Sequence, residues 1–422
     1  MNEPTRQPQV VRRIFKSLLV LAMSSVLGLC VLLAALRLEH RTDITLPTPT
    51  GPFAVGRAIY DWTDDAKLDK SAPVPGTKRE LLVWIWYPSA TAPPAATTDD
   101  YVPAPLAAQV ERDLGTLLGE FLTRDLSKVH THSIRNAEVS PQQQSYPVVI
   151  MRAGASAEVW NYSTLAEDLA SHGYVVVGFD APYRTHVVVF PDGRVMRRTP
   201  ENNPELCEGQ EQAQQAACAN KFLTAWTADL ALVLDQLQRW NTSDASGKFK
   251  GHLDMTRVGV FGHSFGGATA AQFCHDDSRC KAGIDVDGQP FGSVIQAGLG
   301  QPFMILLSDH SRESGPESLQ IMANIRSIYD HLPPDGRLLI QIRGANHFLF
   351  SDDGALLKSR IVMRTLRMLG IVGIDGRRQL AATTYCLRKF FDAYLKGTSV
   401  KGTDVSLLDI SSPLYPEIVV LE

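Results

Sequence analysis

A serine between glycines stands where an apolar stretch gives way to a run of small residues. Residues 257–270 read RVGVFGHSFGGATA, so Gly262, Ser264 and Gly266 form a G-x-S-x-G pattern. This pattern is typical of a tight strand-to-helix turn that exposes a nucleophilic hydroxyl, and the glycines let neighbouring backbone approach closely. The free amides at the start of the helix would face the reacting centre. The segment predicts Ser264 as a nucleophile.

A serine hydroxyl is a weak nucleophile, so the chemistry needs a histidine base and an acid that orients it. After such a turn the acid and then the histidine follow the serine along the chain. His347 follows an apolar stretch at 337–342 after four further residues and is the favoured base, with His310 as the alternative. The acid has three candidates, which these patterns leave open: Asp287, Asp309 and Asp285.

The negative charge formed during acyl transfer needs two backbone amides. The first is expected from Phe265, directly after the serine, and the second from the turn that follows an apolar strand at 146–151. That turn reads RAGAS from 152 to 156, which favours the amide of Ala155. An ordinary turn at Gly154 is the alternative interpretation.

Several apolar runs must position these residues. Continuous apolar strands separated by amphipathic helices are typical of a mainly parallel central sheet with helices on both faces, so the fold class is α/β. We expect one catalytic domain over 59–422. Strands are predicted at 80–87, 146–151, 174–179, 257–261, 282–286, 303–307 and 337–342, and helices at 106–122, 160–171, 222–240, 266–273 and 383–396.

The N-terminus carries an uncharged stretch from 17 to 36 that follows Arg12, Arg13 and Lys16. Twenty helical residues span about 30 Å, enough to cross a bilayer. The pattern favours a transmembrane signal anchor over a cleaved signal peptide. The excess of positive charge before it predicts a cytoplasmic N-terminus at 1–16, a tether at 37–58 and an extracytoplasmic catalytic domain, which would be secreted if the segment were cleaved.

The six cysteines include two closely spaced pairs, which suits an oxidising compartment. Cys207 and Cys218, and likewise Cys274 and Cys280, are candidate disulfides, with buried free thiols as the alternative. Residues 184–222 are predicted to form an excursion beside the active site, pinned by the first pair. No metal-ligand spacing and no nucleotide motif occurs, so no metal or cofactor is expected. A formal charge of −4 and the lack of a basic run argue against nucleic acid as a partner.

Six ordered motifs between about residue 50 and residue 400 together resemble the plasma-type (group II) platelet-activating factor acetylhydrolases. The resemblance implies the α/β-hydrolase fold, Ser264 as nucleophile, Asp287 as acid, His347 as base, and the amides of Ala155 and Phe265 as oxyanion donors. Family members often have His-Gly before the oxyanion residue, where this chain has Ala153-Gly154. The motifs are GPFAVG at 51–56, WYPS at 86–89, DLASHG at 168–173, GHSFGGAT at 262–269, GIDVD at 283–287 and QIRGANH at 341–347.

The resemblance also implies calcium-independent hydrolysis of short or oxidised acyl groups at the second position of phospholipids. Two other hypotheses stay open: a broad carboxylesterase or polyester hydrolase, because fold and triad do not specify the ester, and a catalytically inactive binding module. The apolar helix at 106–122 is expected either to pack on the core or to form a surface over which a lipid reaches the site. These patterns do not address the oligomeric state.

Overall fold

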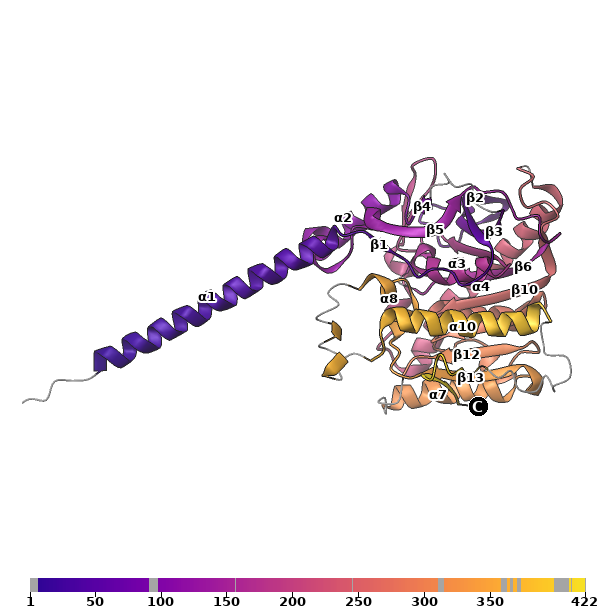
Figure 1. Cartoon of the computed structure of the whole chain (residues 1–422). Helices are drawn as coiled ribbons and strands as arrows, with labels where there is room; N and C mark the ends of the chain where they lie inside the picture. Colours follow the sequence, from indigo (N-terminus) through magenta and orange to yellow (C-terminus); the bar gives the residue numbers. More distant parts are fainter. Residues whose placement is uncertain are drawn as a thin grey trace, which may run out of the picture.

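One twisted sheet forms the centre of the molecule (Figure 1). The computed structural model describes residues 7–90, 98–155, 157–244, 246–309, 315–357, 363–364, 367–369, 373–397, 410 and 412–421. The strands of this sheet are β1 (Ile44–Thr45), β2 (Ala54–Leu68), β3 (Lys78–Ser89), β4 (Thr98–Asp100), β5 (Val129–Arg135), β6 (Tyr146–Arg152), β7 (Val175–Asp180), β10 (Leu253–His263), β11 (Cys280–Val286), β12 (Phe303–Leu307), β13 (Arg337–Ile342) and β14 (Ile418–Val420).

The strand order within these ranges is β1-β5-β2-β3-β7-β6-β10-β11-β12-β13-β14, and β4 pairs with β5. The run from β7 through β6, β10, β11 and β12 to β13 is parallel, whereas β3 is antiparallel to both β2 and β7. Parallel strands are covered on both faces, which is why strands such as β6 are buried along their whole length. The predicted α/β class is confirmed.

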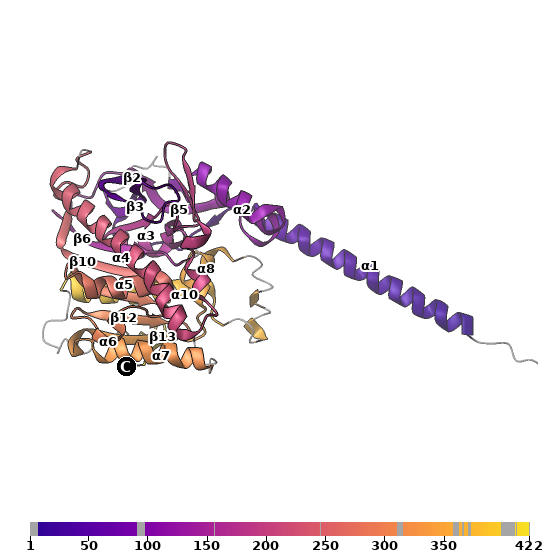
Figure 2. The same ribbon diagram turned by 180° about the vertical axis from the view of Figure 1, so that it is seen from behind.

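Helices cover both faces of the sheet. In β6, Val149 and Met151 pack toward one face while Val148 and Ile150 pack toward the other, as the two-residue period of a strand requires. Figure 1 shows the face covered by α3 and α10, and Figure 2 shows the face covered by α4, α5 and α7. The helices are α1 (Gln7–His40), α2 (Ala104–Leu122), α3 (Ser163–Ser171), α4 (Gln212–Ser243), α5 (Phe265–Asp276), α6 (Val294–Ala297), α7 (Pro316–Asp330), α8 (Asp353–Leu356) and α10 (Gly376–Leu395).

The predicted tether at 37–58 is wrong. α1 continues to His40, β1 pairs with β5, and β2 already begins at Ala54. Side-chain contacts hold this segment against the rest of the fold. The backbone amide of Thr50 donates to Asp168 on α3 (2.8 Å), and buried Arg57 forms an ion pair with Asp99 (2.8 Å). The catalytic body therefore begins well before residue 59.

α1 projects away from this body as a single long helix (Figure 1). Among the described helices, the stretch Arg12–His40 is long and apolar enough to cross a membrane by length and composition, and its apolar part is exposed. Its last turns contact α2, where Arg37 forms an ion pair with Glu120. A signal sequence near the N-terminus would pass the same test. Residues 1–6 of the expected cytoplasmic segment lie outside the described residues.

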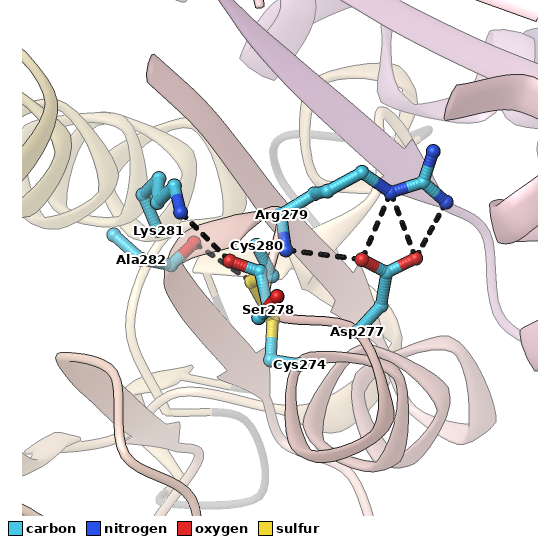
Figure 3. The surroundings of a disulfide bond; sticks show 7 residues. All are labelled: Cys274, Asp277, Ser278, Arg279, Cys280, Lys281 and Ala282. Atoms are coloured by element: carbon cyan, nitrogen blue, oxygen red, sulfur yellow. Dashed lines mark hydrogen bonds and ion pairs between the residues drawn. A yellow bond between two sulfur atoms is a disulfide. The ribbon is translucent and has the colours of Figure 1, made fainter. Parts of the chain in front are cut away.

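Both predicted disulfides are present. Cys207 is bonded to Cys218 with a Cα–Cα distance of 5.6 Å, and Cys274 to Cys280 with 5.1 Å. The second bond joins the end of α5 to the start of β11, beside the ion pair between Arg279 and Asp277 (Figure 3). The first lies in the excursion, which also contains the hairpin of β8 (Val187–Val189) and β9 (Val195–Arg197) and a short helix, η4 (Pro204–Cys207).

Candidate active site

Ser264 occupies the single residue between β10 and α5, where the chain turns sharply. Its backbone is left-handed, with φ 57° and ψ −128°, which costs energy for a residue with a side chain. Its amide donates to the carbonyl of Val286 (2.9 Å), which helps hold the turn. A Cβ at Gly262 would overlap the backbone of Gly266, and a Cβ at Gly266 would overlap the carbonyl of Arg152, so both must be glycine.

One chain of hydrogen bonds joins the side chains of Ser264, His347 and Asp287. The Nε2 atom of His347 lies 3.1 Å from the hydroxyl oxygen of Ser264, and its Nδ1 atom lies 2.7 Å from Oδ2 of Asp287. A carboxylate only accepts, so Nδ1 carries the proton and Nε2 accepts from the serine. Asp287 is buried and its other oxygen accepts from the amide of Ser308 (2.7 Å). The arrangement can move a proton from the hydroxyl to the ring.

The two alternative acids, Asp285 and Asp309, accept hydrogen bonds from backbone amides in the turns near the site. Oδ1 of Asp285 accepts from the amide of Gly288 (2.8 Å), and burial raises the pKa of this carboxyl well above its usual range. Oδ2 of Asp309 accepts from the amide of Gly344 (2.7 Å), in the turn that leads to His347. The alternative base, His310, lies outside the described residues.

Sequence reasoning missed a second histidine that acts on the same loops. The ring of His263 lies 4.6 Å from the ring of His347, and its Nε2–H donates to the His347 carbonyl (2.9 Å). Its Nδ1 accepts from the hydroxyl of Tyr162 (2.8 Å), which in turn accepts from the amide of Gly154 (3.3 Å). The network thus ties the loop at Gly154 to His347.

Burial keeps His263 uncharged. Loss of solvent, with a smaller contribution from His347 nearby, lowers the pKa of His263 to about 3. A neutral ring is what the network needs, because one nitrogen accepts while the other donates. The ring of His263 therefore adds no positive charge beside His347 at neutral pH. A buried tyrosine 101 residues away in the chain gives no sequence signal for this contact.

The two expected oxyanion residues lie on the same small hollow. Ala155 and Phe265 line it together with Ser264, and its volume is about 100 Å³. Phe265 is the first residue of α5, and the first amides of a helix have no partner within the helix. The carbonyl of Ala155 accepts from Nη1 of Arg198 (2.8 Å), a contact that the sequence did not suggest. Two amides can therefore face a developing oxyanion here.

A larger hollow of about 290 Å³ also borders Ser264. It contains His347 and Asp287, and its far wall comes from apolar side chains of α7. The residues of α7 that line it are Ser318, Leu319, Ile321, Met322 and Ile325. Among the described residues, no group of three or more His, Cys, Asp or Glu side chains could hold a metal ion.

A parallel sheet with a serine on such a strand-to-helix turn defines the α/β-hydrolase class. The chain belongs to the family described as platelet-activating factor acetylhydrolase, isoform II, whose model matches residues 39–188 and 228–398. Residues 189–227, which hold most of the excursion, lie between the two matched parts.

Individual relatives agree with this family. A probable 1-alkyl-2-acetylglycerophosphocholine esterase of Arthroderma benhamiae is 23% identical over 409 residues, covering 93% of this chain and 98% of that protein. The platelet-activating factor acetylhydrolase of Canis lupus familiaris is 28% identical over 255 residues, which is 57% of this chain and 56% of that protein.

A solved structure extends the comparison to the fold. A ferulic acid esterase from Streptomyces cinnamoneus matches with a TM-score of 0.69 and 27% identity, covering 90% of this chain and 100% of that chain. Together these relationships make the protein a carboxylic ester hydrolase.

Proposed function

We propose that the protein is a serine esterase that removes short acyl groups from esters, with the sn-2 acetyl or short or oxidised acyl group of a glycerophospholipid as its main substrate. The observation that carries the proposal is the continuous hydrogen-bond chain from Asp287 through His347 to Ser264. The names of the relatives, a 1-alkyl-2-acetylglycerophosphocholine esterase and platelet-activating factor acetylhydrolases, support the substrate class.

The reaction follows from the geometry. The hydroxyl oxygen of Ser264 attacks the ester carbonyl while its proton passes to Nε2 of His347, and Asp287 stabilises the imidazolium that forms. The amides of Phe265 and Ala155 stabilise the negative charge on the carbonyl oxygen. His347 then protonates the leaving alcohol, which leaves an acyl-enzyme. Water hydrolyses this intermediate by the same steps, so the products are a carboxylic acid and an alcohol.

A broad carboxylesterase is the second candidate function. The observation that favours it is the likeness to a ferulic acid esterase over 90% of the chain, because that protein is named for a different ester. The apolar wall formed by α7 in the larger hollow would accept an aromatic group as well as a lipid. Comparing short-chain and long-chain sn-2 phospholipids with simple aryl esters separates the two.

We further propose that α1 anchors the protein in a membrane, with the catalytic body on the extracytoplasmic side. The excess of Lys and Arg before the apolar stretch supports this orientation. The two disulfides support it as well, because such bonds persist in oxidising compartments. An accessibility assay, with protease added outside intact cells, checks the orientation: the catalytic body should be cleaved from outside.

Replacement of the nucleophile tests the mechanism. Ser264→Ala should lower the turnover of an aryl acetate by at least ~10⁴-fold, because no acyl-enzyme can form. The fold should survive, since only a small side chain is lost. A fluorophosphonate probe should label the natural protein and not the variant. Turnover by the variant at the natural rate would refute the mechanism, and an unlabelled, inactive natural protein would favour the inactive binding module.

A further inference from the structure

The excursion that the family model does not match forms one wall of the small hollow at Ser264. Residues 189–227 fall between the two matched parts of the chain, yet about half of the side chains around this hollow come from them. These side chains are Pro204, Glu205, Cys207, Glu208, Gln215 and Ala219. A part of the chain that the family model does not match thus lies beside Ser264.

Covalent and packing contacts fix the position of this wall. The Cys207–Cys218 disulfide joins η4 to the first turns of α4, and Cys207 and Ala219 are buried in one apolar cluster with Phe265. The ring of Trp226, on α4, meets the ring of Phe265 edge-on with centroids 4.9 Å apart. A wall held in this way cannot retreat to admit a larger group without opening the disulfide or the cluster.

The same tryptophan also supports the strand that leads to the oxyanion loop. It covers the guanidinium of Arg152, which lies 3.7 Å from the ring centroid. That guanidinium is fully buried, and its three nitrogens have no hydrogen-bond partner among the described residues. Aromatic contact therefore replaces hydrogen bonding for a buried cation, and it holds α4, at Trp226, against the end of β6.

The position of His347 indicates which part of the ester enters each hollow. The leaving alcohol must receive its proton from Nε2 of His347, so it occupies the larger hollow, which contains this ring. The described lining of the small hollow includes both oxyanion residues, Ala155 and Phe265, but not His347. The carbonyl oxygen would lie against these two amides, and the acyl chain, as the remaining substituent of the carbonyl carbon, would extend into the rest of the small hollow.

The size of the small hollow limits the acyl chain. Its volume is about 100 Å³, whereas an engineered apolar cavity of about 150 Å³ holds benzene with its six carbons, so about four carbon atoms fit here. A butyryl chain has three carbons beyond its carbonyl. We propose that the excursion, stapled by Cys207–Cys218, is the acyl wall of this esterase and restricts its substrates to chains of about two to four carbons. This proposal rests on the proposed serine mechanism.

The test compares water-soluble p-nitrophenyl esters that differ only in the length of the acyl chain. The natural protein should hydrolyse p-nitrophenyl acetate and butyrate, and its kcat/KM for the octanoate should be at least ~10-fold lower. In Cys207→Ser/Cys218→Ser the octanoate-to-acetate ratio of kcat/KM should rise about 10-fold, because the wall can move. The matched control is Cys274→Ser/Cys280→Ser, which removes the disulfide at the far end of α5 and should keep the natural ratio.

A second variant tests the proposal if the protein without the Cys207–Cys218 disulfide fails to fold. Ala219→Val adds two carbons to a buried position on the wall and should lower the butyrate-to-acetate ratio about 10-fold. An unchanged ratio in Ala219→Val, or in a folded Cys207→Ser/Cys218→Ser protein, overturns the acyl wall. Failure of the natural protein to hydrolyse any of the three esters would instead overturn the serine mechanism.

Discussion

Two walls of different construction face each other across Ser264. On one side stand the turns after β10, β11 and β13, where main-chain hydrogen bonds and two left-handed residues, Ser264 and Asp287, set the geometry. On the other side stands the excursion, which is held by side-chain packing and a disulfide. The family model matches the first wall and omits the second. In the proposed mechanism, the main chain holds the reacting groups in place and the side chains of the excursion adapt the site to its ester.

This contrast predicts that substitutions in the turns after β10, β11 and β13 cause the largest losses of activity. Asp287→Asn should lower kcat for an aryl acetate by about 10⁴-fold, because an amide no longer holds His347 in the right tautomer. Asp309→Asn is the control, since Asp309 supports the turn at Gly344 and should cost far less. Steady-state kinetics with circular dichroism separates activity from folding. A severe loss in Asp309→Asn with a mild one in Asp287→Asn would reassign the acid.

A smaller effect is expected where the excursion supports the turn after β6. Arg198→Ala removes the hydrogen bond to the Ala155 carbonyl, so the peptide that presents an oxyanion amide should become less well ordered. We expect kcat to fall about 10-fold with KM little changed, less than the loss of a donor itself. Arg198→Lys should recover part of the rate.

The neighbouring arginine gives the matched control for this prediction. Arg197 pairs with Asp113 on α2 and does not line the hollows at Ser264, so Arg197→Ala should keep the natural kcat. Equal losses in both variants would indicate a general loosening of the hairpin. In that case the excursion would not act on the oxyanion loop through Arg198.

The smallest effect concerns lipid access. Leu122, at the end of α2, is 60% exposed and lies beside the contact between α2 and α1. If α2 forms a surface for lipid, Leu122→Ser should lower the hydrolysis of vesicle-borne phospholipid about 3-fold and leave a soluble ester unaffected. Leu68→Ser, at an equally exposed leucine in the β2–β3 hairpin, should change neither. Equal loss on both substrates would make α2 part of the core alone.

The sequence was informative where one local pattern decides a structure. Continuous apolar runs predicted the parallel strands, because burial on both faces demands them. It was silent on β2 and β5, whose half-exposed strands mix charged and apolar residues, and on α7. The glycines around Ser264 predicted the turn that the structure contains.

Contacts between distant segments gave no such signal. Tyr162, Arg198 and Trp226 belong to ordinary-looking segments, and their roles arise only from the neighbours that the fold brings to them. The roles of Ser264, Asp287 and His347 stay predictions, although their side chains are now in contact. The helix at 106–122 exists as α2 with a break at Gly115, and the side chains of 116–118 lie outside the described set.

The junction between α1 and α2 has a consequence for where the enzyme can work. Residues 41–43 alone separate α1 from the sheet, Arg37 pairs with Glu120 (2.8 Å), and Arg124 donates to the carbonyl of Glu39 (2.8 Å). A long flexible linker would let a catalytic body explore a wide volume around its anchor. The linker at 41–43 is too short to allow such movement. If α1 is embedded in a bilayer, the opening at Ser264 stays at a fixed distance from the membrane surface and in a fixed orientation to it. Its working range is then a thin layer over its own membrane, and neighbouring membranes lie beyond its reach.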